Sequence, residues 1–387
     1  MKNHGILFTK KDTAELVEVP MPEPKAGEVR VRLVVDTVSS GTERANLTGV
    51  PDGGVGIFAT GQPDAVTWPR QCGYSNSGIV DKVGAEVDGI KPGDRVALSW
   101  TTHREYVCAP ARCVYPVPDA VSLSDAALAH TATFPMAAIR KCRIELGESA
   151  IVMGQGVLGQ LVVKLLKAAG AAPVIAADPV AAKREEALRL GADFALDPLA
   201  PDFAAEAKRI CRSEYTKIFG RVEMSGPQVG IEVTGIGAGL DGCLDAIAPF
   251  GRIALLGCTR NSNFSIDYYH KVHGRGVTLV GAHTACRATD ESAPGWWTER
   301  DDALAFLRLV ALGRIDLAGF VRETHSPKEC GEVYARLAKD GAFPVVQFNW
   351  EETKCRQMVD MSCLSQGQAH SAAPPTRSLS SSVIRLT

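Results

Sequence analysis

The chain has 387 residues, of which 45% are hydrophobic, and a formal net charge of −2 at pH 7. This length suits two domains with full hydrophobic cores, and a charge so close to zero gives no reason to expect nucleic acid or an acidic membrane surface as a partner. No apolar run reaches the ~18 residues of a membrane span, and the N-terminus has no signal-peptide pattern. The eleven cysteines are scattered without a C-x-x-C pair, which predicts reduced thiols in the cytoplasm.

The predicted elements change character along the chain. Residues 1–118 contain short strands separated by turns, such as the alternating segment 29–35 and the glycine-rich stretch KVGAEVDGIKPGDRVAL. Residues 119–284 alternate apolar strands with helical patterns, which is typical of a doubly wound parallel sheet in an α/β fold. Residues 285–350 return to mixed structure, and the Ser-, Ala- and Pro-rich residues 351–387 predict a disordered tail.

A glycine motif, G-x-G-x-x-G, follows the apolar run at residues 150–153 and precedes a helical pattern that ends at Gly170. Such a motif alone arises by chance, but the order of strand, glycine turn, helix and strand is that of a dinucleotide site. The first glycine permits a tight turn, the second lets a pyrophosphate approach the backbone, and the third lets the helix pack close to the strand. Helix-start N–H groups favour phosphate. We therefore predict that a dinucleotide binds at Gly154, Gly156, Val157, Leu158 and Gly159.

Asp178 follows the next apolar run, about 20 residues after the first glycine, where a carboxylate accepts hydrogen bonds from a ribose 2′-OH. The same carboxylate would repel a 2′-phosphate, so we expect NAD as the cofactor and not NADP. Lys183 and Arg184 follow closely and soften this preference.

The chain resembles the medium-chain dehydrogenases/reductases over about residues 15–350. The resemblance rests on KPGDRVAL (91–98), GQGVLGQLVVKLLKAAGA (154–171), LRLGAD (188–193), GIEVTG (230–235) and FGRIALLG (250–257), in this order. It implies a GroES-like catalytic domain made of residues 1–118 and 285–350, and a Rossmann nucleotide-binding domain at residues 119–284. Substrate and nicotinamide would meet in the cleft between them, and the family suggests a homodimer joined near residues 277–280.

The chain departs from this family at the residues that usually hold zinc. Where zinc-dependent members have a cysteine, this sequence has Ser40 in the stretch SGTE, and where they have G-H-E it has Gly73, Tyr74 and Ser75. The third position is matched only by His130, and the four-cysteine structural lobe is absent. Because zinc requires three protein ligands, we expect no metal and a member of the zinc-free branch, similar to sugar, polyol or tetrapyrrole dehydrogenases. A metal held by His130, Glu43 and His103 is the alternative.

Without zinc, side chains must hold the substrate oxygen and move its proton. We expect His130 to be the general base, because it alone among these residues titrates near neutral pH, and Tyr74 to donate to the oxygen. Ser40 and Thr42 would relay the proton, and Glu43 would orient His130 or contact a substrate hydroxyl. Each also has a purely structural interpretation: a core or capping histidine, a packed tyrosine, turn hydroxyls and a solvated carboxylate.

Further cofactor residues follow the later predicted strands, where ligands of open α/β sheets bind. They are Thr234, Gly235, Gly257, Cys258 and Ala282. Trp296 and Trp297 either offer a platform for a sugar ring or anchor a loop. The favoured function is oxidation of a secondary alcohol on a sugar, polyol or similar small polar molecule. A zinc-free quinone or enone reductase and a non-catalytic NAD-binding protein are the alternatives.

Overall fold

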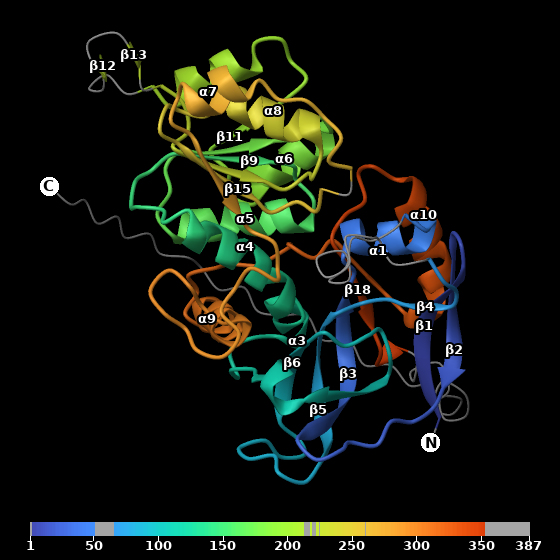
Figure 1. The fold of residues 1–387 in the computed structure, drawn as a ribbon. Coiled ribbons are helices and arrows are strands. Elements are labelled where there is room, and N and C mark those ends of the chain that lie inside the picture. Colours follow the sequence, from blue (N-terminus) through green and yellow to red (C-terminus); the bar gives the residue numbers. More distant parts are fainter. Residues whose placement is uncertain are drawn as a thin grey trace, which may run out of the picture.

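The computed structural model describes residues 2–50, 66–212, 217–218, 222–223, 225–259 and 261–352. The expected tail lies outside these ranges from residue 353 onwards. Two large sheets, one mixed and one parallel, organise the molecule and lie in different halves of the view in Figure 1. The expected combination of a doubly wound parallel sheet with a mostly-β region is confirmed.

The mixed sheet is built around one long, alternating strand, β3 (Glu28–Thr37), in which Val29, Val31 and Leu33 are fully buried. Its other strands are β5 (Ser75–Val83), β6 (Arg95–Ser99), β7 (Tyr106–Pro110), β8 (Val114–Pro116), β17 (Glu323–His325) and β18 (Val346–Asn349). The order is β17-β18-β3-β5-β6-β8, and β7 also pairs with β3. Segments from both ends of the chain therefore form one sheet.

The parallel sheet consists of short, continuous apolar strands such as β9 (Ala150–Met153) and β10 (Val174–Ala177), all of whose residues are buried. Its other strands are β11 (Phe194–Leu196), β14 (Val229–Glu232), β15 (Arg252–Leu255) and β16 (Thr278–Gly281). The strand order is β11-β10-β9-β14-β15-β16. The chain adds strands to one side of β9 as far as β11 and then returns to add β14, β15 and β16 on the other side, so the order of addition reverses between β9 and β14. This reversal is the point at which doubly wound sheets bind nucleotides.

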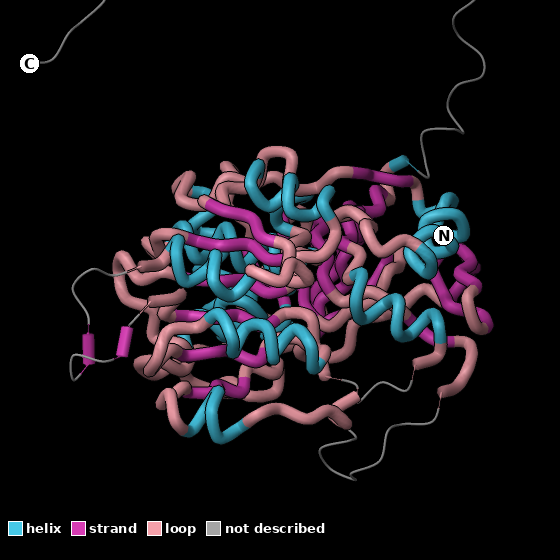
Figure 2. Tube along the Cα trace, turned by 90° about the horizontal axis from the view of Figure 1, so that it is seen from above, coloured by secondary structure: helices cyan, strands magenta, loops and turns pink. Residues whose placement is uncertain are grey.

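Helices lie on both sides of the parallel strands, as Figure 2 shows. They are α4 (Ala129–Lys141), α5 (Val157–Ala168), α6 (Ala181–Arg189), α7 (Phe203–Ile210) and α8 (Gly237–Ala246), while α9 (Glu299–Ala311) packs against α4 and β8. In α5 the buried residues Leu161, Val162, Leu165 and Leu166 recur at helical spacing, which explains why this segment covers the sheet. Helix α4 packs against α5, α9 and the ends of both sheets, so it joins the two halves.

The remaining elements are short or peripheral. They are β1 (Asn3–Lys10), β2 (Thr13–Val19), α1 (Ser40–Thr48), β4 (Arg70–Gln71), η1 (Ala111–Cys113), α3 (Leu123–Ala126), β12 (Lys217–Ile218), β13 (Val222–Glu223), η2 (Tyr269–His273), η3 (Pro327–Glu329) and α10 (Cys330–Lys339). Ser40 and Thr42, for which turn positions were the structural interpretation, lie in helix α1, whose first turn also contains Glu43. The domain boundaries near residues 118 and 284 stay predictions. No helix in the described part of the chain is both long and apolar enough to cross a membrane.

Candidate active site

The carboxyl ends of the parallel strands lie at one edge of their sheet. The register pairs Met153 of β9 with Ala177 of β10 and with Glu232 of β14, and it pairs Leu255 of β15 with Gly281 of β16. The residues that follow these ends therefore gather at the same edge. They include the predicted cofactor residues Gly154, Asp178, Thr234, Gly235, Gly257, Cys258 and Ala282.

The glycine turn between β9 and α5 has room for a phosphate. Gly154 has a φ of +97°, which L side chains rarely adopt. A Cβ on Gly159 would lie 1.9 Å from the Gly154 oxygen, so only glycine permits this approach of helix and strand. A Cβ on Gly156 would meet nothing within 4 Å, which leaves space beside the helix start formed by Val157 and Leu158. The turn fits a dinucleotide pyrophosphate, and that role stays a prediction.

Asp178 ends the next strand with a fixed, nearly buried carboxylate. Its oxygens accept hydrogen bonds from the N–H of Gln155 at 2.8 Å and from the N–H of Val180 at 2.9 Å. Arg184 donates to the Asp178 carbonyl at 2.8 Å and pairs with Asp197 at 3.3 Å. Of the two basic residues that closely follow Asp178, Arg184 is therefore already engaged by another carboxylate.

The loops after β14 and β15 pack backbone against backbone. The Glu232 carboxylate accepts hydrogen bonds from the N–H of Thr234 at 2.7 Å and of Gly235 at 3.1 Å, and burial raises its pKa. A Cβ on Gly235 would lie 2.4 Å from the Cys258 oxygen, and one on Gly257 would lie 2.3 Å from the Gly235 nitrogen. These glycines hold the two loops together and leave Cys258 exposed at the sheet edge.

A cluster of aromatic side chains surrounds His130 at the start of α4. The His130 ring lies 5.4 Å from Tyr74, 4.6 Å from Trp100 and 5.0 Å from Phe134, measured between ring centroids. Ser75 brings the strand and the helix together, because its hydroxyl accepts from the N–H of the residue after His130 and donates to the carbonyl of residue 127. The structure thus unites two predicted catalytic residues, His130 and Tyr74.

His130 lies in the first turn of α4 and is buried, with an unused ring nitrogen. Its Nδ1 lies 3.2 Å from Oε1 of Glu299, whereas Nε2 is buried and has no hydrogen-bond partner among the described residues. Burial lowers the pKa of His130, and the neighbouring Glu299 carboxylate opposes this shift only in part. The imidazole is therefore neutral near pH 7, and Nε2 is a buried, unpartnered proton acceptor.

Glu299, at the start of α9, is the centre of a polar network around His130. Its carboxylate accepts from Trp100 Nε1 at 2.9 Å and from the Tyr115 hydroxyl at 3.1 Å, and Arg287 Nη1 lies 3.5 Å away. Burial alone would raise the pKa of Glu299, but His130 and the hydrogen bonds of the network lower it to about 2. The carboxylate is thus charged over the whole working range of pH.

Tyr74 carries a neutral phenol. Burial raises its pKa to about 12, while hydrogen bonds from the hydroxyls of Ser39 and Thr42 counteract part of this effect. The nearby Cys258 is among the groups that raise the pKa of Tyr74, so the phenol lies close to the cofactor edge. Ser40, the expected relay, is half-buried at the start of α1, and the contact to Tyr74 is made by Ser39 instead.

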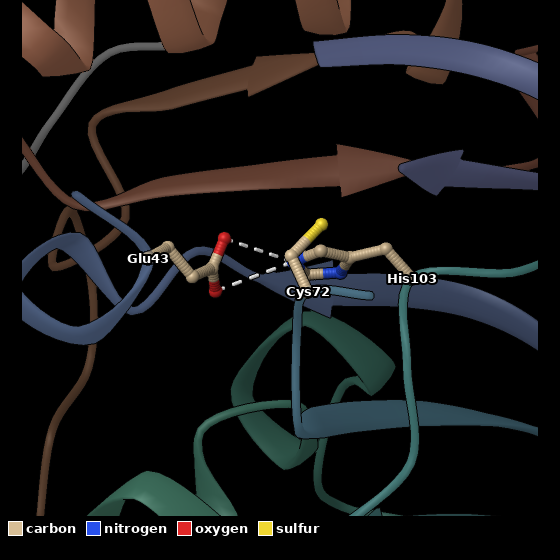
Figure 3. Close-up of side chains that lie close together, drawn as sticks. All are labelled: Glu43, Cys72 and His103. Carbon is tan, nitrogen blue, oxygen red and sulfur yellow. Dashed lines mark hydrogen bonds and ion pairs between the residues drawn. The ribbon is translucent and has the colours of Figure 1, made fainter. Parts of the chain in front are cut away.

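Glu43 does not lie where we expected it. The carboxylate beside His130 is Glu299, whereas Glu43 is 1% exposed and lies in a buried cluster with Cys72 and His103 (Figure 3). His103 Nε2 is 3.2 Å from Glu43 Oε2, and the ligand atoms of the three residues all lie within 4.8 Å of one another. The alternative metal site of His130, Glu43 and His103 is therefore not formed, because Glu43 and His103 lie together with Cys72 and not with His130.

Sequence reasoning missed Glu299, Trp100 and Ser39. Glu299 lies in a segment far from His130 along the chain, and no local pattern marks it. Trp296 and Trp297 lie next to the other end of α4, where they stack on Lys141 and Arg140 at 4.9 and 3.7 Å. This position supports the loop-anchor interpretation and leaves Trp100 as the aromatic side chain over His130.

Two family models match the chain. The alcohol dehydrogenase GroES-like domain matches residues 32–119, and the zinc-binding dehydrogenase domain matches residues 157–293. The first covers most of the mixed sheet together with Tyr74 and Trp100, and the second covers most of the parallel sheet. The expected GroES-like region is thereby confirmed.

Curated relatives and solved structures agree with these models. L-threonine 3-dehydrogenase of Pyrococcus abyssi is 27% identical over 69% of this chain and 79% of its own. Sorbitol dehydrogenase of Pongo abelii is 29% identical over 62% of this chain and 71% of its own. A zinc-binding dehydrogenase of Sinorhizobium meliloti bound to NADP has a TM-score of 0.71 at 21% identity, covering 90% of this chain and 99% of its own. An Escherichia coli alcohol dehydrogenase complexed with NADH has a TM-score of 0.71 at 18% identity, with the same shares covered. The chain is therefore a dehydrogenase of the medium-chain dehydrogenase/reductase superfamily.

Proposed function

We propose that this dehydrogenase oxidises a secondary alcohol of a sugar, polyol or similar polar molecule with NAD, without a catalytic zinc. The observation that carries the proposal is the unused Nε2 of His130, which is buried beside the neutral phenol of Tyr74 and backed by the charged Glu299. A base, a hydrogen-bond donor and an orienting carboxylate are the groups that alcohol oxidation requires.

His130 accepts the hydroxyl proton of the substrate at Nε2 as the alcohol becomes a carbonyl. The imidazolium that forms is stabilised by Glu299, 3.2 Å from Nδ1, which also fixes the ring orientation. Tyr74 donates its phenolic proton in a hydrogen bond to the substrate oxygen, and Ser39 and Thr42 orient the phenol. Trp100 covers His130, so substrate must displace or contact its indole.

The residues at the parallel-sheet edge fit a nicotinamide dinucleotide. A bound nicotinamide would supply the hydride acceptor for the alcohol carbon. The turn from Gly154 to Gly159 would hold the pyrophosphate, and the fixed Asp178 carboxylate would accept the ribose hydroxyl. We favour NAD because Asp178 would repel a 2′-phosphate and because Arg184 is paired with Asp197.

The residues at the family's usual zinc positions do not fit that metal. Ser40 offers a hydroxyl, Tyr74 a phenol whose pKa is raised to about 12, and only His130 is a strong zinc ligand. Zinc requires at least three such ligands in a catalytic site. We therefore assign no step of the reaction to a metal.

The proposed substrate class rests on the polar groups around His130 and on the names of the relatives. Hydroxyl, phenol, imidazole and carboxylate groups suit a substrate with several hydroxyls. Relatives named sorbitol dehydrogenase and D-guloside 3-dehydrogenase act on such molecules according to their names. We expect the enzyme to work in the cytoplasm, where its cysteines stay reduced.

The test is turnover of the purified protein with NAD and with NADP on a panel of polyols, hexoses and simple secondary alcohols, followed by absorbance at 340 nm. Reduction of NAD by at least one polyol is expected. A protein that binds NADH but reduces no cofactor with any alcohol would instead be a non-catalytic relative. Reduction of quinones or enones alone, with NADPH, would favour the reductase alternative.

A further inference from the structure

Figure 3 shows His103 beside the Glu43 carboxylate, and a second buried carboxylate, that of Asp36, contacts the other nitrogen of the ring. His103 Nδ1 lies 2.9 Å from Oδ2 of Asp36, and Nε2 lies 3.2 and 3.3 Å from the two oxygens of Glu43. His103 and Asp36 are 0% exposed and Glu43 is 1% exposed. A buried histidine held in this way by two negative charges keeps both of its ring protons.

The two carboxylates are held by further donors. Asp36 accepts from Asn76 Nδ2 at 2.9 Å and from Trp350 Nε1 at 2.7 Å. Glu43 accepts from the Tyr334 hydroxyl and from the backbone N–H of Ser39, the latter at 2.8 Å. The cluster is therefore tied to the strand β3, to the C-terminal end of the described chain and to the start of α1.

The donor set of this cluster does not suit a metal, although its atoms lie close enough together. Both nitrogens of His103 face carboxylates, so neither presents a free lone pair. The Cys72 thiol lies 3.5 Å from the carbonyl oxygen of Ile6, to which it donates, and burial raises its pKa well above the usual value. A metal would have to displace the contacts of His103 with Asp36 and Glu43 and the hydrogen bond from Cys72 to Ile6, so the contacts within the cluster compete with metal binding.

The cluster reaches Tyr74 by two routes. Glu43 fixes the Ser39 backbone, and the Ser39 hydroxyl contacts the Tyr74 phenol. The His103 ring packs directly on Gly73, the residue before Tyr74, where a Cβ would lie only 2.6 Å from the ring. The His103 ring thus fixes the backbone position of Tyr74. The Glu43 carboxylate, acting through Ser39, fixes the orientation of the Tyr74 phenol.

We propose that Asp36, His103 and Glu43 form a metal-free ion-pair cluster that positions Tyr74 for the substrate oxygen. These three are positioning residues, because none of them touches the reacting atoms. The proposal rests on the role of Tyr74 in the proposed function, and it replaces the catalytic role we expected for Glu43.

The first test compares Glu43→Ala with Glu43→Gln. Alanine removes the acceptor for the Ser39 N–H, so kcat should fall by about 10- to 100-fold, as misplaced catalytic groups cause, with an unchanged KM for NAD. Glutamine keeps that acceptor and should restore most of kcat. In a Tyr74→Phe background, Glu43→Ala should cost little more, because the phenol it positions is gone. Equal losses in both backgrounds would overturn the proposal.

The second test does not depend on turnover. Crystal structures should show the Tyr74 phenol displaced from Ser39 in Glu43→Ala and retained in Glu43→Gln. If the wild type oxidises no alcohol but the phenol moves as expected, the proposed function fails and the positioning cluster stands. An unmoved phenol in Glu43→Ala would overturn the cluster's role.

The third test addresses the metal. Elemental analysis of the wild type and of Cys72→Ser should find less than stoichiometric zinc in both, and Cys72→Ser should keep full activity. About one zinc per chain in the wild type, lost in Cys72→Ser, would overturn the metal-free cluster.

Discussion

At the residue scale, His130 is the side chain on which the proposed chemistry depends most. His130→Ala should lower kcat for alcohol oxidation by roughly 10²- to 10⁴-fold, the usual contribution of a positioned proton acceptor. NADH dissociation should change little, because His130 serves the substrate oxygen and not the pyrophosphate. Tyr74→Phe, the matched variant, should lose less. Stopped-flow and steady-state rates check this, and normal turnover of His130→Ala would remove His130 from the mechanism.

The dependence of kcat/KM on pH follows from the direction in which the pKa of His130 is shifted. Burial lowers the pKa of His130 below its ordinary 6.5 despite Glu299. Oxidation needs the neutral base, so kcat/KM should be flat above pH 7 and fall in acid with a midpoint below 6.5. In Glu299→Gln the cation loses its partner, and the midpoint should move to still lower pH. A midpoint above that of free histidine, or one unchanged in Glu299→Gln, would contradict this assignment.

Only part of this site could be predicted from the sequence. His130 and Tyr74 could be found because they replace zinc ligands in a recognisable frame. Glu299 and Trp100 could not, since their contacts with His130 depend on how α9 and the loop after β6 pack. Glu43 was misassigned for a related reason: its partner His103 comes from a distant segment that the sequence does not link to α1.

At the element scale, the unit of β9, α5 and β10 should decide cofactor preference. Asp178→Ser removes the carboxylate that would repel a 2′-phosphate, so the ratio of NADPH to NADH affinity should rise. Asp193→Ser is the matched control, because Asp193 accepts from the N–H of Val174 at the opposite end of β10. Fluorescence titration of both cofactors measures the ratio. Tighter binding of NADPH by the wild type would contradict the role of Asp178.

Elements with strong local patterns could be predicted, and the others could not. The strand β9 coincides with the apolar run at residues 150–153, and the helix α5 ends two residues before the expected Gly170, because continuous apolar runs and helical periods are local signals. Helix α1 has a weak apolar pattern and buries the charged Glu43. Contacts with Ser39, Tyr334 and His103 make that burial favourable, and the sequence links neither Tyr334 nor His103 to this helix.

At the scale of the whole molecule, the buried cluster should couple stability to pH. Burial would lower the pKa of His103, but Glu43 and Asp36 outweigh it and raise the pKa to about 10. The folded value exceeds the unfolded value of about 6.5, so this stabilisation is full below pH 6.5 and is lost towards pH 10. The gap in melting temperature between wild type and His103→Gln should therefore shrink from pH 7 to pH 9.5. A constant gap would show that His103 is not charged.

The parallel sheet leaves β16 at its edge, with Thr278 and Gly281 exposed. Pairing of two such edges would give the homodimer that we expect, because an unpaired strand edge offers free backbone donors and acceptors. Light scattering at micromolar concentration should give twice the chain mass of 41.2 kDa. A proline in place of Leu279 should reduce the mass to that of one chain, and a monomeric wild type would contradict the expectation.

Trp100 lies between solvent and the proposed base. It has a φ of 57°, it is 53% exposed, and its ring meets that of His130 edge to face at 4.6 Å between centroids. Indole emission responds to the polarity around the ring and is quenched by a neighbouring imidazolium. The fluorescence of Trp100 should therefore change as His130 gains or loses a proton. This side chain is an intrinsic spectroscopic probe of the proposed base.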